Sequence, residues 1–269
     1  MAAHTPVGYV FSDPPAGLPE GHRRMLSHLA AMLDPFTIRR LEQAGVASGA
    51  RCLEVGAGAG TVAHWLADRV GPDGQVVATD LDPSHLPAHP RIVPLRHDIA
   101  TDDLPGSGYH LIHARLVLAH LPGRREVLGR LAAALAPGGA LVVEEFDPSW
   151  DRCLLYTPDP DAHRLFAAYH TALLAVLRAA GTDPGWGRQV PHAMRECGLE
   201  EVSAEFWAQS WHGAQTGCLL PYAATAQVRD ELVAHGMAAA DIDRFRALLL
   251  DPRLVIHGNM AVSTVGRRP

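Results

Sequence analysis

The residues best suited to chemistry lie in a glycine-rich segment in the first quarter of the chain. Residues 52–61 read Cys-Leu-Glu-Val-Gly-Ala-Gly-Ala-Gly-Thr, so an apolar run containing Glu54 leads into Gly56, Gly58 and Gly60. A buried strand would end just before Gly56 and enter a tight turn. Glycine there permits unusual dihedral angles and a close approach of a ligand that a Cβ would block. Amide groups of the following helix would face that ligand, so the segment predicts a loop that binds a nucleoside-type cofactor.

The spacing of the glycines indicates which cofactor. A dinucleotide fingerprint reads G-x-G-x-x-G, whereas this loop reads G-x-G-x-G and holds Thr61 at the third dinucleotide position. Glu54 also precedes the first glycine by two residues, and a carboxylate beside the loop suits a cationic ligand better than a pyrophosphate. S-adenosylmethionine carries a sulfonium and an ammonium group and no phosphate. The segment resembles the first motif of class I S-adenosylmethionine-dependent methyltransferases.

Two further acidic residues follow apolar segments at fitting distances. Asp80, followed by Leu81, ends the segment Gln-Val-Val-Ala-Thr-Asp and lies 20 residues beyond Gly60. A ribose-binding carboxylate belongs at about this place, in nicotinamide-binding folds as well. Asp98 and Ile99 end a third segment. The resemblance implies that Asp98 contacts the exocyclic amine of adenine and that Ile99 packs against the ring.

The order of the motifs carries the resemblance over residues 36–150. Residues 109–115 read as a fourth strand and run into Leu-Val-Leu-Ala-His-Leu-Pro, and residues 135–147 read as a helix end, a Pro-Gly-Gly turn and a fifth strand. These phrases are similar to the ubiquinone/menaquinone-type branch common in bacteria. One departure is His110, where that family usually has Asp. The resemblance implies that the cofactor-binding residues are Glu54, Gly56, Ala57, Gly58, Gly60, Asp80, Leu81, Asp98, Ile99 and Arg115.

Methyl transfer from a sulfonium is an in-line displacement that needs placement of a nucleophile and sometimes removal of a proton. Histidine is the usual base near neutral pH, and His113 and His120 lie at the end of the fourth strand and just after it. Glu145, next to Glu144 on the fifth strand, is a third candidate that could orient a histidine. The alternative is that all are structural residues with hydrogen-bond or ion-pair partners. No metal is predicted, because no tight spacing of ligands supports one.

Aromatic residues outside the motifs are candidates for a substrate pocket, although aromatic side chains are more often part of a core. Tyr9 and Phe11 lie in a segment rich in proline and glycine, where a core role is less expected. The predicted pocket residues are Tyr9, Phe11, Tyr156, Tyr169 and Trp186.

The elements that position these residues follow from hydrophobic periodicity. Strands alternate with helices over residues 51–147, which predicts a doubly wound, mostly parallel sheet with its ligand site at the carboxyl ends of the strands. The fold class is α/β, with seven strands and an antiparallel last strand. Residues 21–45 read as a helix interrupted at Asp34-Pro35, and residues 161–180 as an amphipathic helix. Residues 202–212 and 255–265 read as strands, and residues 219–250 as two helices.

The domain organisation follows from these elements. We expect an N-terminal helical cap over residues 1–45, a cofactor-binding core over residues 46–150, and lid helices with the last strands over residues 151–269. The helical insertions would cover the ligand site as a substrate lid.

Composition narrows the possible functions. The 269 residues are 48% hydrophobic and 19% charged, with a net charge of −6, which favours a globular protein with a small-molecule substrate and disfavours a nucleic-acid binder. No C-x-x-C motif occurs among the 4 cysteines, and no signal peptide or apolar run of about 20 residues is evident. We therefore expect a cytoplasmic protein without a membrane partner, and a homodimer is possible.

The sequence thus predicts methyl transfer from S-adenosylmethionine to an O, N or C atom of a small organic metabolite, in keeping with bacterial secondary metabolism. Two alternatives stay open. One is a protein that binds S-adenosylmethionine without methylating, such as a cyclase, since binding motifs persist when the chemistry changes. The other is an NAD(P)-dependent oxidoreductase.

Overall fold

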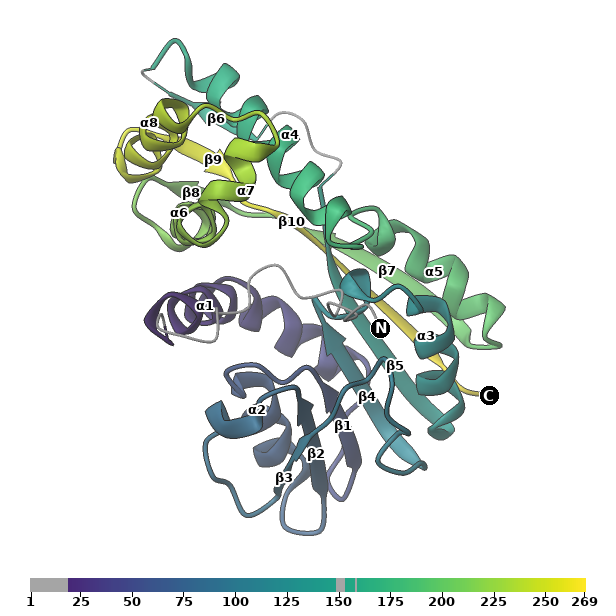
Figure 1. Cartoon of the computed structure of the whole chain (residues 1–269). Helices are drawn as coiled ribbons and strands as arrows, with labels where there is room; N and C mark the ends of the chain where they lie inside the picture. Colours follow the sequence, from purple (N-terminus) through teal and green to yellow (C-terminus); the bar gives the residue numbers. More distant parts are fainter. Residues whose placement is uncertain (1–18, 149–152, 158) are drawn as a thin grey trace, which may run out of the picture. The chain divides into compact units, whose positions relative to one another are not determined.

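A seven-stranded sheet forms the larger part of the molecule (Figure 1). The structure, a computed structural model, describes residues 19–148, 153–157 and 159–269. The strands of this sheet are β1 (Arg51–Val55), β2 (Gln75–Asp80), β3 (Ile92–Arg96), β4 (Tyr109–Arg115), β5 (Leu135–Asp147), β7 (Glu200–Trp207) and β10 (Met260–Arg267). Their order is β3-β2-β1-β4-β5-β10-β7. Strands β3, β2, β1, β4 and β5 are parallel neighbours, and β10 runs antiparallel to β7.

Helices cover both faces of this sheet because its central strands are apolar on both sides. On one face, Leu53, Ile112 and Leu141 pack against α3 (Arg124–Ala133) and α5 (Trp186–Glu196). On the other face, Cys52 and Leu111 pack against α2 (Thr61–Val70) and the end of α1 (Pro19–Gln43). Two short 3-10 turns, η1 (Pro83–His85) and η2 (Leu118–His120), follow β2 and β4. The predicted α/β class and the mostly parallel seven-stranded sheet are confirmed.

A second group of elements is organised around a small antiparallel sheet. Its strands are β6 (Leu154–Tyr156), β9 (Val255–His257) and β8 (Ser210–His212), in that order. Its helices are α4 (Ala162–Ala179), α6 (Thr216–Gln227), α7 (Arg229–Ala234) and α8 (Ala239–Leu250). Phe245 lies at the centre of this core, stacked on Tyr169 and in edge contact with Phe166.

The chain divides into two compact units. The sheet unit consists of Leu33–Asp147, Gly185–Trp207 and Ala261–Pro269, and the other unit contains the described residues of Met1–Met32, Pro148–Pro184 and Ala208–Met260. Residues 33–43 of α1 therefore belong to the sheet unit. The division into cap, core and lid at residues 45 and 150 stays a prediction.

Three element predictions were wrong in detail. Helix α1 continues through Pro35 instead of breaking there. Residues 202–212 form parts of two strands that belong to different sheets, and so do residues 255–265. Residues 219–250 hold parts of three helices. In each case the local pattern is ambiguous and tertiary packing decides the outcome.

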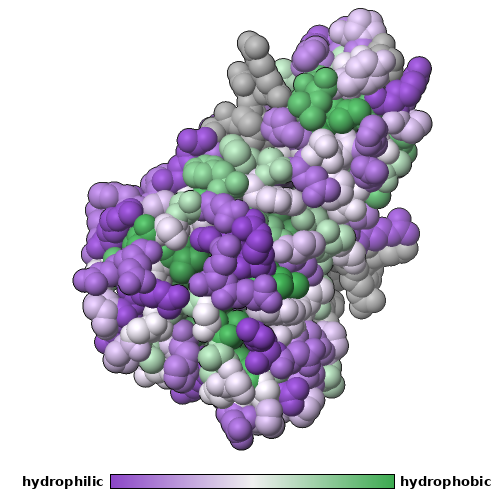
Figure 2. All heavy atoms as spheres, turned by 180° about the vertical axis from the view of Figure 1, so that it is seen from behind, coloured by the Kyte–Doolittle hydropathy of each residue, from purple (hydrophilic) through white to green (hydrophobic). Residues whose placement is uncertain are grey.

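Exposed apolar residues are scattered over the surface. On the face drawn in Figure 2 they form small groups separated by hydrophilic residues. Within the described ranges, no helix is both long enough and apolar enough to cross a membrane.

Candidate functional site

The glycine-rich loop joins β1 to α2 at the carboxyl end of the parallel sheet. Gly56 and Gly58 adopt φ angles of +68° and +51°, in the left-handed region that side chains disfavour. A Cβ built on Gly56 would come within 2.4 Å of Cγ2 of Val117, so the loop packs directly against the turn that follows β4. Gly60 caps the N-terminus of α2 without any side-chain hydrogen bond. The loop therefore packs closely against the turn after β4, and its glycines leave backbone groups in place of side chains on its surface.

The acidic residue at the end of β2 faces this loop. Oδ2 of Asp80 accepts a hydrogen bond from the amide of Gly58 at 2.8 Å, and Oδ1 accepts one from the amide of Asp82 at 3.1 Å. The next residue, Leu81, is 60% exposed. A carboxylate offers about four lone-pair positions, so Asp80 can also accept hydrogen bonds from a ligand. The structure brings together the two motifs that the sequence predicted to meet.

The segment after β3 places Asp98 and Ile99 near the same edge of the sheet. Asp98 is half-buried and accepts a hydrogen bond from the amide of Ala100 at 2.9 Å. Ile99 is buried in the core cluster that includes Val55, the last residue before the loop. The adenine contacts of Asp98 and Ile99 that the resemblance implies stay predictions.

Glu54 and His113 form a buried ion pair beneath the loop. The two residues lie opposite one another on β1 and β4, and His113 Nδ1 is 2.8 Å from Glu54 Oε2. His113 Nε2 lies 3.5 Å from Oε2 of Glu144 on β5. All three residues are at most 3% exposed. The imidazole of His113 is thus held between two carboxyl groups.

The charges of this group favour a protonated His113. Burial opposes the imidazolium, but Glu54 and Glu144 outweigh this effect and raise the pKa of His113 to about 9. Burial likewise opposes ionisation of Glu144, yet His113, Arg115 and Thr37 together lower the pKa of that carboxyl group. A histidine in this setting holds a proton, which differs from the base role expected from the sequence.

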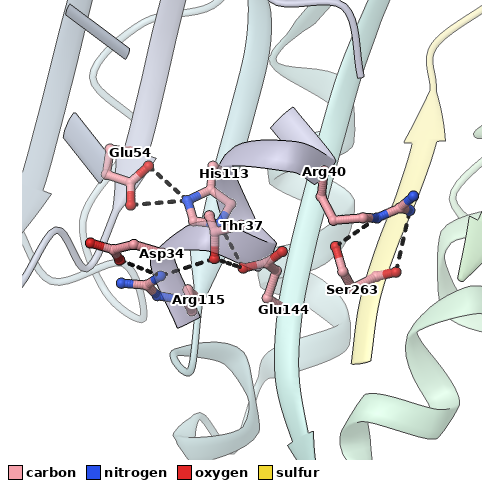
Figure 3. Close-up of polar contacts among 8 residues, drawn as sticks. All are labelled: Asp34, Thr37, Arg40, Glu54, His113, Arg115, Glu144 and Ser263. Carbon is pink, nitrogen blue, oxygen red and sulfur yellow. Dashed lines mark hydrogen bonds and ion pairs between the residues drawn. The ribbon is translucent and has the colours of Figure 1, made fainter. Parts of the chain in front are cut away.

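Helix α1 adds two side chains that the sequence did not single out as site residues. Arg115 Nη1 donates to Oδ1 of Asp34 and to Oγ1 of Thr37, both at 2.9 Å (Figure 3). The Thr37 hydroxyl in turn donates to Oε2 of Glu144 at 2.5 Å. No motif marks Thr37, and Asp34 reads locally as a helix cap, so only the fold reveals that both reach the strand ends.

Glu145 and His120 lie near the turn after β4. Oε1 of Glu145 accepts a hydrogen bond from the amide of Ala119 at 3.0 Å. Burial raises the pKa of Glu145 to about 8, in spite of the amides of Ala119 and Leu118 and the charge of Arg124. Burial and Arg124 lower the pKa of His120 to about 4, so this half-buried imidazole is neutral at pH 7.

The predicted pocket aromatics lie in different settings. Trp186 is fully buried in the core between α3, α5 and the sheet, and Tyr169 is buried in the core of the other unit. Both are core residues, as aromatic side chains more often are. Tyr156 is 59% exposed on β6. Tyr9 and Phe11 lie outside the described residues.

Metal-ligand side chains do not converge in the part of the chain that the structure describes. There, no three His, Cys, Asp or Glu residues are arranged so that they could hold an ion.

Comparisons with known proteins agree with this geometry. The family model described as a methyltransferase domain matches residues 24–211. Methyltransferase str2 of Strobilurus tenacellus is 32% identical over 158 residues, covering 56% of this chain and 54% of its own length. The ubiquinone/menaquinone biosynthesis C-methyltransferase UbiE of Laribacter hongkongensis is 28% identical over 151 residues, covering 53% of this chain and 59% of its own length. The chain spans little more than half the length of these relatives.

A solved structure shows the same fold. A candidate methyltransferase from Bacillus halodurans superposes with a TM-score of 0.56 at 15% sequence identity, covering 86% of this chain and 98% of that one. At this identity the likeness concerns the fold alone.

Proposed function

Because the chain belongs to the methyltransferase domain family, we propose that it transfers a methyl group from S-adenosylmethionine to an O, N or C atom of a small organic molecule. The family match agrees with the predicted resemblance, which rests on the ordered set of motifs along the parallel strands. The observation that carries the proposal is the approach of Asp80 to the glycine-rich loop, 2.8 Å from the amide of Gly58.

The residues at the loop fit this cofactor. The buried carboxyl group of Glu54 beside the loop disfavours a pyrophosphate, and the carboxylate of Asp80 orders the loop by accepting a hydrogen bond from the Gly58 amide. The same carboxylate retains lone pairs for two ribose hydroxyls. The exposed side chain of Leu81 and the half-buried carboxyl group of Asp98 suit an adenine ring and its amine. A cationic nucleoside matches this set better than a dinucleotide.

S-adenosylmethionine, when bound, supplies an electrophilic methyl group on a sulfonium centre. The residues of the chain would hold and orient this cofactor. Asp80 and the loop amides would hold the ribose end, and the packing of Gly56 against Val117 holds the loop in place. Glu54, His113 and Glu144 lie beneath the loop as an ion-paired group, and Arg115 and Asp34 are joined to it through Thr37.

Proton removal has a smaller role in this proposal. His113 is enclosed by carboxyl groups, and a neutral His120 with a pKa of about 4 is a weak base at pH 7. Placement of a nucleophile that loses its proton readily is therefore the main contribution of the protein.

The net charge of the chain bears on the class of substrate. A net charge of −6 disfavours a polynucleotide, which needs neutralisation of its phosphates. We propose a small, partly apolar metabolite. The name of UbiE assigns that relative to ubiquinone and menaquinone biosynthesis, and an apolar ring system of that kind is one member of the proposed class. A cytoplasmic location, a role in secondary metabolism and a homodimer stay predictions.

Calorimetric titration tests the cofactor directly. We expect S-adenosylhomocysteine to bind the purified chain and NAD not to bind. Incubation with methyl-labelled S-adenosylmethionine and a metabolite extract should then label low-molecular-weight products. Binding of NAD without S-adenosylhomocysteine would overturn the cofactor assignment. Labelling of RNA or DNA that collapses as salt rises would overturn the small-molecule assignment, and tight binding without any transfer would indicate a non-methylating relative.

A further inference from the structure

Helix α1 contains a proline between the two residues that reach the strand ends. Pro35 lies inside the helix, with Asp34 before it and Thr37 just after it. Proline lacks an amide hydrogen, so the hydrogen bond to the carbonyl group four residues earlier is missing and the helix is weak there. Yet α1 continues through this point as a single helix. Tertiary contacts around Pro35 must therefore hold the helix together.

Phe36 stacks on Trp207 and Arg40 donates to Ser263, and a further group of contacts meets at the hydroxyl group of Thr37. Thr37 is 0% exposed, and its Oγ1 accepts from Arg115 Nη1 at 2.9 Å while donating to Glu144 Oε2 at 2.5 Å. A hydroxyl group is both a donor and an acceptor, so Thr37 can link the guanidinium of Arg115 to the carboxylate of Glu144. Figure 3 shows Thr37 between Arg115 and Glu144, with Asp34 on the far side of the guanidinium. A valine of the same shape could make neither bond.

The same hydroxyl connects α1 to the strand that enters the glycine-rich loop. Glu144 lies 3.5 Å from His113, and His113 pairs with Glu54 at 2.8 Å. Glu54 is two residues from the first glycine of the loop. Hydrogen bonds and ion pairs therefore link α1 through Glu144 and His113 to Glu54, within one unit of the molecule, and the 3.5 Å approach of Glu144 to His113 is the longest of these links.

We propose that Thr37 and Asp34 are positioning residues that fix residues 33–43 of α1 on the carboxyl ends of β4 and β5, and thereby form the cofactor site before the cofactor arrives. The inference rests on the proposed function for the identity of the cofactor. Pre-organisation of this kind lowers the cost of binding, because the helix does not have to be ordered at that step. Neither residue touches the reacting atoms in this assignment.

Substitution at Thr37 separates positioning from packing. Thr37→Val removes the hydroxyl and keeps the shape, whereas Thr37→Ser keeps the hydroxyl and loses one methyl group. Arg39→Gln is the matched control, since it breaks the half-exposed ion pair of α1 with Glu205 and leaves the cluster intact. Two quantities are measured for each variant: hydrogen exchange of the amides of residues 36–43 without ligand, and the Kd for S-adenosylhomocysteine.

We expect Thr37→Val to speed exchange in residues 36–43 about tenfold, with β1 and β4 unchanged, and to raise the Kd about tenfold, in line with loss of buried hydrogen bonds. Thr37→Ser and Arg39→Gln should stay within about twofold of the wild type in both quantities. Unchanged exchange and unchanged Kd in a folded Thr37→Val protein would overturn the proposal. So would a Thr37→Ser protein as impaired as Thr37→Val, because that result assigns the effect to packing.

Two further results keep the outcomes distinct. If Thr37→Val does not fold, Asp34→Asn decides, because it keeps an acceptor for Arg115 and removes only the charge. Faster exchange in residues 36–43 of that variant supports the proposal, and wild-type exchange overturns it. If the wild-type chain binds no S-adenosylhomocysteine, the proposed function fails. The claim of a pre-formed cofactor site then fails with it, whatever the exchange data show for the anchoring of α1.

Discussion

Asp80 accepts a hydrogen bond from the amide of Gly58 across 2.8 Å, which joins the end of β2 to the loop that follows β1. The contact explains why an acid at the end of one strand and a glycine-rich turn after its neighbour occur together. The left-handed φ of +51° at Gly58 is part of the loop conformation in which this amide donates to the carboxylate. The carboxylate thus orders the loop and remains able to accept from a ligand.

Replacing Asp80 by Ala should weaken binding of S-adenosylhomocysteine by about 1.5–3 kcal/mol, because charge-assisted hydrogen bonds are lost. Calorimetry of the variant measures this directly. Asp73→Ala is a suitable control, as Asp73 is an exposed acid just before the other end of β2. An unchanged affinity in Asp80→Ala would remove the ribose assignment.

The packing of the loop against the turn after β4 predicts coupling between Gly56 and Val117. Gly56→Ala should destabilise the chain by about 2–4 kcal/mol, since φ is +68° and the new Cβ would lie 2.4 Å from a Val117 methyl group. In the double variant Gly56→Ala/Val117→Ala the steric part is relieved and only the backbone strain persists. Urea unfolding of the four proteins in the cycle should show this coupling; strict additivity would mean that the two residues do not touch.

The ion pair of Glu54 and His113 predicts a stability that falls in alkaline solution. His113 has a folded-state pKa of about 9 against an ordinary value of 6.5, so its contribution is complete below pH 6.5 and is lost as pH rises through 9. The loss amounts to about 3 kcal/mol for a shift of this size. Glu54→Gln should move the decline to lower pH, because one of the two attracting carboxyl groups is gone.

Urea unfolding at several pH values between 6 and 10 measures this decline. His192→Gln serves as the control, because His192 is an exposed histidine whose side chain is 75% accessible. Identical pH profiles for wild type and Glu54→Gln would contradict the buried pair.

Replacement of Glu145 should stabilise the protein in alkaline solution. Its folded-state pKa of about 8 lies above the ordinary 4.5, so the wild type loses stability as pH rises from 4.5 to 8 and the buried carboxyl group ionises. Glu145→Gln keeps an acceptor for the Ala119 amide and cannot ionise. We expect it to be more stable than wild type by about 1–3 kcal/mol at pH 8.5 and nearly equal at pH 4.5. Melting temperatures at the two pH values test this, and a variant destabilised at pH 8.5 would show that the fold requires the charge.

His120→Ala should reduce turnover less than about tenfold at saturating cofactor. The imidazole has a pKa of about 4 and is a weak base at neutral pH, whereas removal of a well-matched base costs about 10²–10⁴-fold. Single-turnover rates with an identified substrate give the answer. A loss of a hundredfold or more would restore His120 as the base.

The sequence by itself determined the parallel sheet, the glycine-rich loop and the acids at the strand ends. These features depend on local rules: apolar runs of strand length, glycines where φ must be positive, and carboxylates placed just after strands. The meeting of Asp80 with Gly58 follows from those rules, because neighbouring parallel strands end at the same edge.

Only the tertiary structure decided the roles of the buried polar residues. His113 reads as a candidate base, yet β1 places Glu54 2.8 Å from its Nδ1 and β5 places Glu144 3.5 Å from its Nε2, and these two carboxyl groups raise the pKa of the imidazole. Trp186 and Tyr169 read as pocket candidates and lie in cores. No local pattern marks Thr37. Its partners Arg115 and Glu144 are distant in sequence, and they meet it only because α1 packs on the strand ends. A side chain's charge and accessibility are set by what surrounds it in space, and sequence spacing alone does not specify those neighbours.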